Sequence, residues 1–189
     1  LQVVPELKVP LLLKLLCEEV LRCDGQRTEG IFRISASHSE LAELVQSIRR
    51  TRNFEYKLPA FKDAHIPAGL MKQWLREQPT PLFDNYDRCL ELTKFQHGSA
   101  EESDAFRDIV MSLSEVHRNV VLFLVDFLIL VGDPANVPFT KMPLANLALV
   151  FVPSFLRCPS QDVATMLMNQ PAEQAFVQTL VEYFEKKEW

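Results

Sequence analysis

The segment 114–132, SEVHRNVVLFLVDFLILVG, restricts the possible folds of this chain more than any other, because it is apolar on nearly every side. Asp126 alone interrupts the apolar run between Val120 and Val131. This run is shorter than the roughly 18–20 residues that cross a bilayer, and a helix without a polar face must be packed on all sides. The segment therefore predicts a central buried helix. Its many β-branched residues leave a strand as the alternative.

Amphipathic patterns on both sides of this segment predict further helices. Asp24-Gly25 is a stop signal for the first helix, Ser37-x-x-Glu40 has the spacing of a capping box, and Pro143 opens the penultimate helix, which Pro153 bends or ends. The ranges with helical periodicity are 10–25, 39–50, 67–79, 84–95, 101–113, 140–157 and 171–187. Strand signals are few elsewhere. The sequence therefore predicts an all-α fold, a single multi-helix domain over residues 1–189.

Composition and charge exclude several classes of protein. The hydrophobic content of 48% is enough for a sizeable core, and the net charge of -5 argues against a general nucleic-acid binder. The charge is uneven, however: residues 1–76 carry +3 and residues 77–189 carry -8. A basic surface drawn from the first half could therefore meet an anionic partner.

The cysteines and the first residues bear on the cellular setting. The four cysteines show no CxxC motif and no metal-ligand spacing with histidine, so we expect reduced thiols in a cytoplasmic protein. The chain opens LQVVPELKVP, without an initiator methionine or a signal peptide. We therefore expect a fragment of a longer multidomain protein. No direct membrane insertion is expected, although other domains of the parent could recruit it to membranes.

Signatures of self-contained enzymes are absent from the sequence. It contains no GxSxG, HExxH, Walker-type GxxxxGK[ST] or GxGxxG motif. The four histidines have no partner at i,i+4, which disfavours a zinc site. A hydrolase would need an active site assembled from distant positions.

Arginine, lysine and asparagine side chains beside apolar residues are the more informative pattern. In RTEGIFRIS, residues 27–35, Arg33 stands between Phe32 and Ile34. Either Arg33 anchors something inside the fold, or its apolar neighbours anchor a loop that aims Arg33 outward. Lys72 and Arg76 lie one turn apart on a helix flank, where like charges repel by roughly 0.2–0.5 kcal/mol. Each therefore calls for an anionic or carbonyl partner, the alternative being a solvated flank.

Three blocks together resemble the Rho GTPase-activating protein (RhoGAP) domain family. TEGIFRIS, HIPAGLMKQWLREQPTPLF and MPLANLALVFVPSFLR occur in the order and at the separations of the family's signature blocks. The resemblance extends from the helix at Pro10 to the last helix. It implies an all-α RhoGAP fold and a domain that acts on a small GTPase.

The resemblance also implies roles for particular residues. Arg33 matches the family's arginine finger, which Phe32 and Ile34 would pin to the core. Lys72 matches a lysine near the finger loop and the GTPase surface, and Arg76 matches an arginine that braces the finger loop, often through backbone carbonyls. The remaining matches are Asn146, which would contact the GTPase switch regions, and Pro171, placed before the last helix in a region of partner contacts. From its residue type alone, Asn146 could equally be a surface amide or a structural hydrogen-bonding group.

The implied function is GTPase activation, in which the domain is not itself the hydrolase. It would supply Arg33 in trans to a GTP-bound Rho-, Rac- or Cdc42-type GTPase, whose GTP and Mg²⁺ belong to the partner. The domain would be monomeric and need no cofactor or metal of its own. The alternative is a RhoGAP-like module that binds a GTPase or another protein without stimulating hydrolysis. Four departures from the family blocks bear on partner choice: Ala36, Gln78, Thr80 and Val152.

Overall fold

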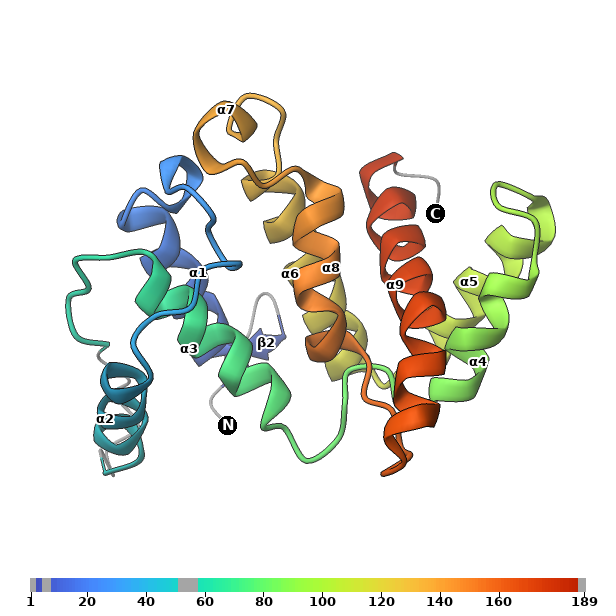
Figure 1. Ribbon diagram of the computed structural model, residues 1–189, viewed down its shortest axis with the longest axis horizontal. Helices are drawn as coiled ribbons and strands as arrows, with labels where there is room; N and C mark the ends of the chain where they lie inside the picture. The colour runs from blue at the N-terminus through green and yellow to red at the C-terminus, as the bar shows by residue number, and fades with distance from the viewer. Residues whose placement is uncertain (1–2, 5–7, 51–57, 187–189) are drawn as a thin grey trace.

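A computed structural model describes residues 3–4, 8–50 and 58–186 of the chain. Helices dominate the described residues, in agreement with the predicted fold class, and Figure 1 shows them side by side along an elongated molecule. The α-helices are α1 (Leu11–Arg22), α2 (His38–Arg50), α3 (His65–Arg76), α4 (Tyr86–Glu91), α5 (Ala100–Ser112), α6 (Glu115–Val131), α7 (Val137–Thr140), α8 (Leu144–Phe155) and α9 (Val163–Lys186). Two 3₁₀ turns, η1 (Gly25–Arg27) and η2 (Leu92–Lys94), and an antiparallel pair, β1 (Val3–Val4) with β2 (Val9–Pro10), complete them.

The apolar segment forms α6, so the helix was the correct prediction and the strand alternative is wrong. The Ser114 hydroxyl caps its first turn by accepting a hydrogen bond from the His117 N–H at 3.2 Å, and such a cap satisfies an N–H that the helix itself leaves unpaired. α6 packs against α8 and α9, and Figure 1 shows it behind α8. Its buried positions belong to a continuous apolar core that also contains residues of α1, α3, α8 and α9. This core joins these four helices to α6.

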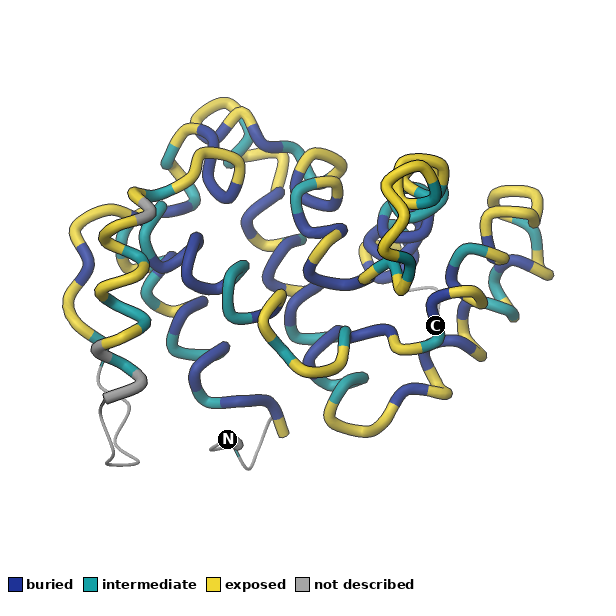
Figure 2. Tube along the Cα trace, turned by 60° about the horizontal axis from the view of Figure 1, so that its bottom comes forward, coloured by how far each residue is buried: buried dark blue, intermediate teal, exposed yellow. Residues whose placement is uncertain are grey.

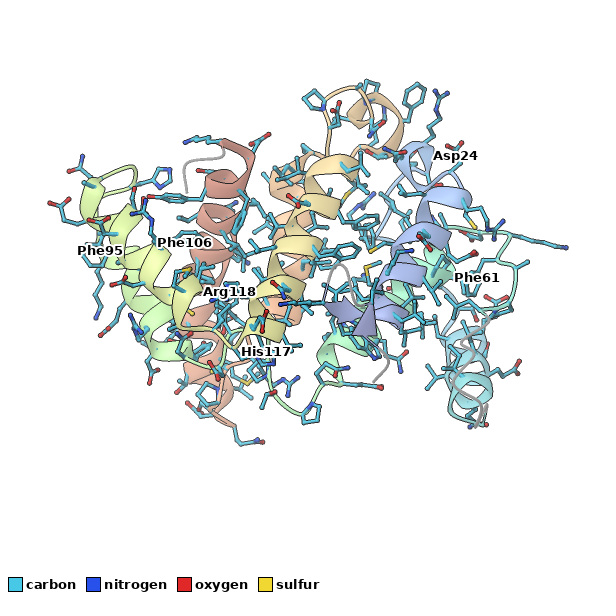
Figure 3. All side chains as sticks on the ribbon, turned by 180° about the vertical axis from the view of Figure 1, so that it is seen from behind. Asp24, Phe61, Phe95, Phe106, His117 and Arg118 are labelled. Carbon is cyan, nitrogen blue, oxygen red and sulfur yellow. The ribbon has the colours of Figure 1, made fainter. Side chains whose placement is uncertain are left out.

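A cluster of aromatic rings joins α5 to α9, at the end of the molecule away from α1 and α2 (Figure 1). The Phe106 ring stacks on Tyr183 at 4.6 Å between centroids and lies 6.4 Å from Phe176. Figure 3 shows Phe106 on α5, next to α9. Tyr86 of α4 donates a hydrogen bond to Glu173, and burial raises the pKa of the Tyr86 hydroxyl. Together these contacts fix α9 from Glu173 to Tyr183.

The last two long helices differ from their predicted bounds. α9 begins at Val163, so Pro171 lies inside it rather than before it. Asp162 supplies the start signal: its carboxylate accepts hydrogen bonds from the N–H and hydroxyl of Thr165, and the hydroxyl bond is the main cause that lowers its pKa. Similarly, α8 continues through Pro153 to Phe155. A proline within a helix removes one hydrogen bond without necessarily ending it.

The first half of α9 carries an exposed apolar surface, whereas its second half is buried. Figure 2 shows this change along the helix. Leu167 is 63% exposed and Met168 80% exposed, and Pro171 is exposed one turn further on. None of the helices among the residues described is long and apolar enough to cross a bilayer.

Candidate functional site

Arg33 lies on a tightly turned loop between η1 and α2, which we call the Arg33 loop (residues 28–36). Two N–H groups, of Arg33 and of Ile34, donate to the Gly30 carbonyl at 2.9 and 2.8 Å. The Ile31 N–H donates to the Thr28 carbonyl at 3.2 Å. These local hydrogen bonds satisfy the backbone of a segment that has no regular secondary structure. The loop therefore has a defined shape.

Ile31 and Phe32 anchor the loop in the core. Both side chains are fully buried, and the Phe32 ring packs edge-on against Phe151 of α8 at 5.0 Å and Phe127 of α6 at 6.1 Å. The prediction that Phe32 is an anchor is thus confirmed, but the same prediction for Ile34 is wrong. Ile34 is 45% exposed, since the turn at Gly30 carries it to the surface. Ile31 takes its place in the core.

Two residues of the loop have left-handed backbone conformations. Gly30 has φ +66° and Phe32 has φ +65°. A left-handed conformation costs an ordinary residue roughly 1–2 kcal/mol, so burial of the Phe32 ring must outweigh this strain. At Gly30 a Cβ would also lie 2.6 Å from the Ile34 Cδ1. Gly30 is therefore required both by its dihedral angle and by the packing of Ile34 over it.

Replacing Gly30 with alanine is expected to lower the free energy of unfolding by more than the roughly 1–2 kcal/mol that a left-handed conformation alone costs an alanine. Gly98→Ala is the matched control, because Gly98 also has a positive φ, +78°, but its added Cβ would meet no atom within 4 Å. The excess cost of Gly30→Ala over Gly98→Ala, measured by urea denaturation, reports the contact with Ile34. In an Ile34→Ala background that excess should disappear. An equal cost for the two glycine variants would contradict this packing.

Lys72 of α3 holds the loop at the residue before Arg33. Its ammonium group donates a hydrogen bond to the Phe32 carbonyl. Burial lowers the pKa of Lys72, and the positive charge of Arg76 lowers it further. The carbonyl partner that the sequence pattern called for is thus provided by the Arg33 loop itself. Lys72 fixes the peptide group from which the Arg33 side chain begins.

Arg33 itself is exposed. Among the described residues, its guanidinium makes no hydrogen bond or ion pair, and one of its terminal nitrogens lies 3.3 Å from the position that a Cβ on Gly30 would occupy. A structural arginine would be paired with a carbonyl or carboxylate. Of the two interpretations that the sequence left open, the structure favours a loop that is anchored by its apolar residues and presents its cation to the outside.

Arg76 lies at the end of α3 and is exposed, and among the described residues the structure gives no hydrogen bond from its guanidinium. The hydrogen bond to a loop carbonyl comes from Lys72 instead, one turn earlier on α3, where the Arg33 loop passes. The Arg76 backbone carbonyl accepts a hydrogen bond from the Arg157 guanidinium at 2.6 Å, and the Gln78 carbonyl accepts another at 3.0 Å. Arg157 thereby ties the end of α3 to the end of α8.

Asn146 and Pro171 lie on exposed helix surfaces. Asn146, Leu149 and Pro153 are exposed on α8 at spacings of three and four residues, so they form one stripe opposite the buried Phe151. The structure gives no hydrogen bond for the Asn146 side chain within the described ranges. α8 packs against both α3 and α9, and Figure 1 shows the three on one side of the molecule. Lys72 reaches the Arg33 loop directly, whereas Asn146 lies on α8 and Pro171 on α9.

Sequence patterns did not reveal the support of the loop by α7. The Gly30 N–H donates to the Thr140 carbonyl at 2.7 Å, and the Arg27 guanidinium lies 5.0 Å from the centre of the Phe139 ring. α7 has only four residues, too few to show a periodic pattern. Pro138 in its first turn was the available signal. The four cysteines are free thiols in this structure, and within the described ranges no three His, Cys, Asp or Glu side chains could hold a metal ion.

Several known proteins are similar to this chain in sequence, in fold or in both. A GTPase activating protein homolog 4 of Dictyostelium discoideum is 37% identical over 187 residues, covering 96% of this chain and 19% of that protein. Mouse Rho GTPase-activating protein 8 is 35% identical over 172 residues, covering 88% of this chain and 38% of that protein. The chain thus spans well under half the length of these relatives. The crystal structure of human Rho GTPase activating protein 15 has a TM-score of 0.78 at 22% identity, over 94% of this chain and 83% of that one.

The BH domain of GRAF, the GTPase regulator associated with focal adhesion kinase, has a TM-score of 0.75 at 21% identity, and 94% of each chain is covered. At such identities the two structures show a shared fold and no more. The RhoGAP domain family matches residues 10–160, which include the Arg33 loop, α3 and α8. With most of its length matched in this way, the chain belongs to the RhoGAP domain family.

Proposed function

We propose that this domain binds the GTP-bound form of a Rho-family small GTPase and accelerates GTP hydrolysis by presenting Arg33 to the transferring phosphoryl group. One observation carries the proposal: an exposed arginine, unpaired among the described residues, follows directly on a residue that is anchored twice, by the burial of the Phe32 ring and by the hydrogen bond from Lys72 to the Phe32 carbonyl. The names of the relatives, GTPase activating proteins, support the same activity.

The chemistry requires a guanidinium. Charge accumulates on the oxygens of the transferring phosphoryl group, and a planar fork of N–H donors matches those oxygens without titrating near neutral pH. An arginine supplied in trans accelerates hydrolysis by roughly 10³–10⁵-fold, which corresponds to about 4–7 kcal/mol of barrier. A loop that is already folded inserts this group with little ordering cost. The GTPase supplies the GTP, the Mg²⁺ and the attacking water, so the domain is an accessory to the hydrolase.

The surface for the GTPase is formed by the Arg33 loop, α3, α8 and the first half of α9. The α8 stripe of Asn146, Leu149 and Pro153 offers an amide between apolar groups, and α9 adds the exposed Leu167 and Met168. Apolar groups around a few polar ones are typical of protein interfaces. The domain would use this surface as a monomer in the cytoplasm, where its parent protein would meet Rho-type GTPases.

Lys72→Met is expected to lower the stimulated rate of hydrolysis about tenfold or more. The substitution keeps an unbranched side chain in place but removes the hydrogen bond to the Phe32 carbonyl, and bonds from charged donors contribute roughly 1.5–3 kcal/mol. Lys94→Met is the matched control, since Lys94 lies on η2, exposed and paired with Glu91. Single-turnover hydrolysis measures both variants. Equal rates for Lys72→Met and the wild-type domain would show that this hydrogen bond does not position Arg33.

Single-turnover GTP hydrolysis by Rho, Rac and Cdc42 proteins, each with and without the domain, tests the proposed function. We expect stimulation of at least one of them to saturate with domain concentration. Binding to a GTP-loaded GTPase without any stimulation would instead show that the domain is an interaction module. Selectivity among the three GTPases is a difference of affinities over the whole surface, so the assay also identifies the preferred partner.

A further inference from the structure

The Arg33 loop rests on α7, a short turn that has no part in the proposed function. The Gly30 carbonyl accepts hydrogen bonds within the loop, but its N–H donates out of the loop, to the Thr140 carbonyl at 2.7 Å. Arg27 lies over the Phe139 ring beside this bond. Figure 3 shows Asp24, the residue before η1, at the end of the molecule where α7 lies. The beginning of the Arg33 loop is thus attached to α7.

The Thr140 hydroxyl determines the shape of that turn. Thr140 is completely buried. Its hydroxyl donates to the Asn136 carbonyl at 3.2 Å and accepts a hydrogen bond from the Met142 N–H at 3.1 Å. These bonds bracket the Thr140 peptide groups on both sides, and Lys141, with φ +56°, reverses the chain between them. The hydroxyl therefore fixes the direction in which the Thr140 carbonyl points.

The α7 turn is itself fixed to α6. The Asn136 side-chain amide donates to the Leu130 carbonyl at 3.0 Å and to the Val131 carbonyl at 3.4 Å, at the end of α6. α6 also carries Phe127, against which the Phe32 ring packs. One helix therefore supports the Arg33 loop at two separate places, through a ring contact and through the α7 turn. A displacement of α7 would change the support through the α7 turn without touching the contact between the Phe32 and Phe127 rings.

We propose that Thr140 is a positioning residue for Arg33: its buried hydroxyl holds the α7 turn so that the Thr140 carbonyl binds the Gly30 N–H and fixes the start of the Arg33 loop. Thr140 itself touches neither the GTPase nor GTP. The catalytic consequence rests on the proposed function, because a misplacement of about 1 Å at a reacting group can cost two orders of magnitude in rate. The structural consequence concerns this chain alone.

Thr140→Val and Thr140→Ser separate the hydroxyl from the volume of the side chain. Valine keeps the shape without the hydroxyl, and serine keeps the hydroxyl without the methyl group. In single-turnover assays Thr140→Val should lower the maximal stimulated rate about tenfold, while the domain concentration for half-maximal stimulation changes less than twofold. Thr140→Ser should stay within twofold of the wild-type domain in both. A change confined to the half-maximal concentration, or equal losses for both variants, would overturn the proposal.

Combining Thr140→Val with Arg33→Ala tests whether Thr140 acts through the arginine. If it does, Thr140→Val has no further effect on the residual stimulation of an Arg33→Ala domain, because the positioned group is gone. Such non-additivity is the mark of residues that act as one unit. The same tenfold loss in the Arg33→Ala background would show that Thr140 acts elsewhere.

Amide hydrogen exchange of the free domain supplies a readout that needs no GTPase. In Thr140→Val the Gly30 amide should exchange at least tenfold faster than in the wild-type domain, with α5 amides unchanged and Thr140→Ser close to wild type. The proposal would be overturned if all amides of the domain exchanged faster by the same factor, or if the exchange rate of the Gly30 amide did not change. This result stands even if no GTPase is stimulated, so failure of the proposed function and failure of this inference can be told apart.

Discussion

Arg33→Ala is expected to reduce the maximal stimulated rate of GTP hydrolysis by about 10³-fold or more, with little change in thermal stability. The large effect on rate follows because the guanidinium is the one group proposed to meet the developing charge. The small effect on stability follows because Arg33 is exposed and makes no hydrogen bond or ion pair among the described residues. Single-turnover hydrolysis and thermal denaturation of the same preparations measure the two quantities.

Two further variants sharpen this expectation. Arg33→Lys should recover little of the rate, since an ammonium is a point charge and cannot bind two phosphoryl oxygens in a planar fork. Arg107→Ala is the matched control for loss of an exposed arginine, because Arg107 lies on α5 and, in the described part of the chain, pairs with the nearby Asp104. Stimulation by Arg33→Ala equal to that by the wild-type domain would exclude an arginine finger at this position.

Phe32→Ala is expected to lower the free energy of unfolding by about 3–5 kcal/mol, the usual cost of truncating a buried phenylalanine. The ring lies between α6 and α8, so its loss leaves a cavity against Phe127 and Phe151. It also removes the packing that offsets the left-handed conformation of residue 32. Urea denaturation, followed by circular dichroism, measures the change.

Ile34→Ala provides the comparison, because Ile34 adjoins Arg33 on its other side but is 45% exposed. We expect a cost below about 1 kcal/mol. If Phe32→Ala does not fold, Phe32→Leu retains most of the buried volume and should show an intermediate loss of stability. Equal costs at positions 32 and 34 would contradict the division between a buried anchor and a surface residue.

Patterns that extend over many residues predicted most of this fold. The apolar run of α6 and the amphipathic stripes of α1, α3 and α5 repeat over several turns, so single exceptions do not hide them. Local signals were weaker guides. Pro171 was interpreted as the start of a helix that begins at Val163, because a proline fits a first turn as readily as an exposed position inside a long helix. α7 is too short for periodicity.

The candidate site was predictable in part for the same reason. A basic residue between apolar ones indicated an anchored loop, and the structure confirms Phe32 as the anchor. Sequence spacing could not distinguish Ile31 from Ile34, since the left-handed turn at Gly30 decides which side chain enters the core. It also could not decide which of Lys72 and Arg76 reaches a loop carbonyl. That depends on where the loop crosses α3, a tertiary property.

The central claim is that Arg33 stabilises the transition state of GTP hydrolysis. Binding to a GTPase loaded with GDP and aluminium fluoride tests this claim most directly, because the ligand mimics the transferring phosphoryl group, so that contacts made in the transition state strengthen binding. The wild-type domain should bind this complex at least about 100-fold more tightly than the GTPase loaded with a non-hydrolysable GTP analogue. Arg33→Ala should bind the analogue complex with nearly wild-type affinity and lose the preference. An Arg33→Ala domain that keeps the full preference for the aluminium fluoride complex would contradict the assignment of Arg33 as the group that stabilises the transition state.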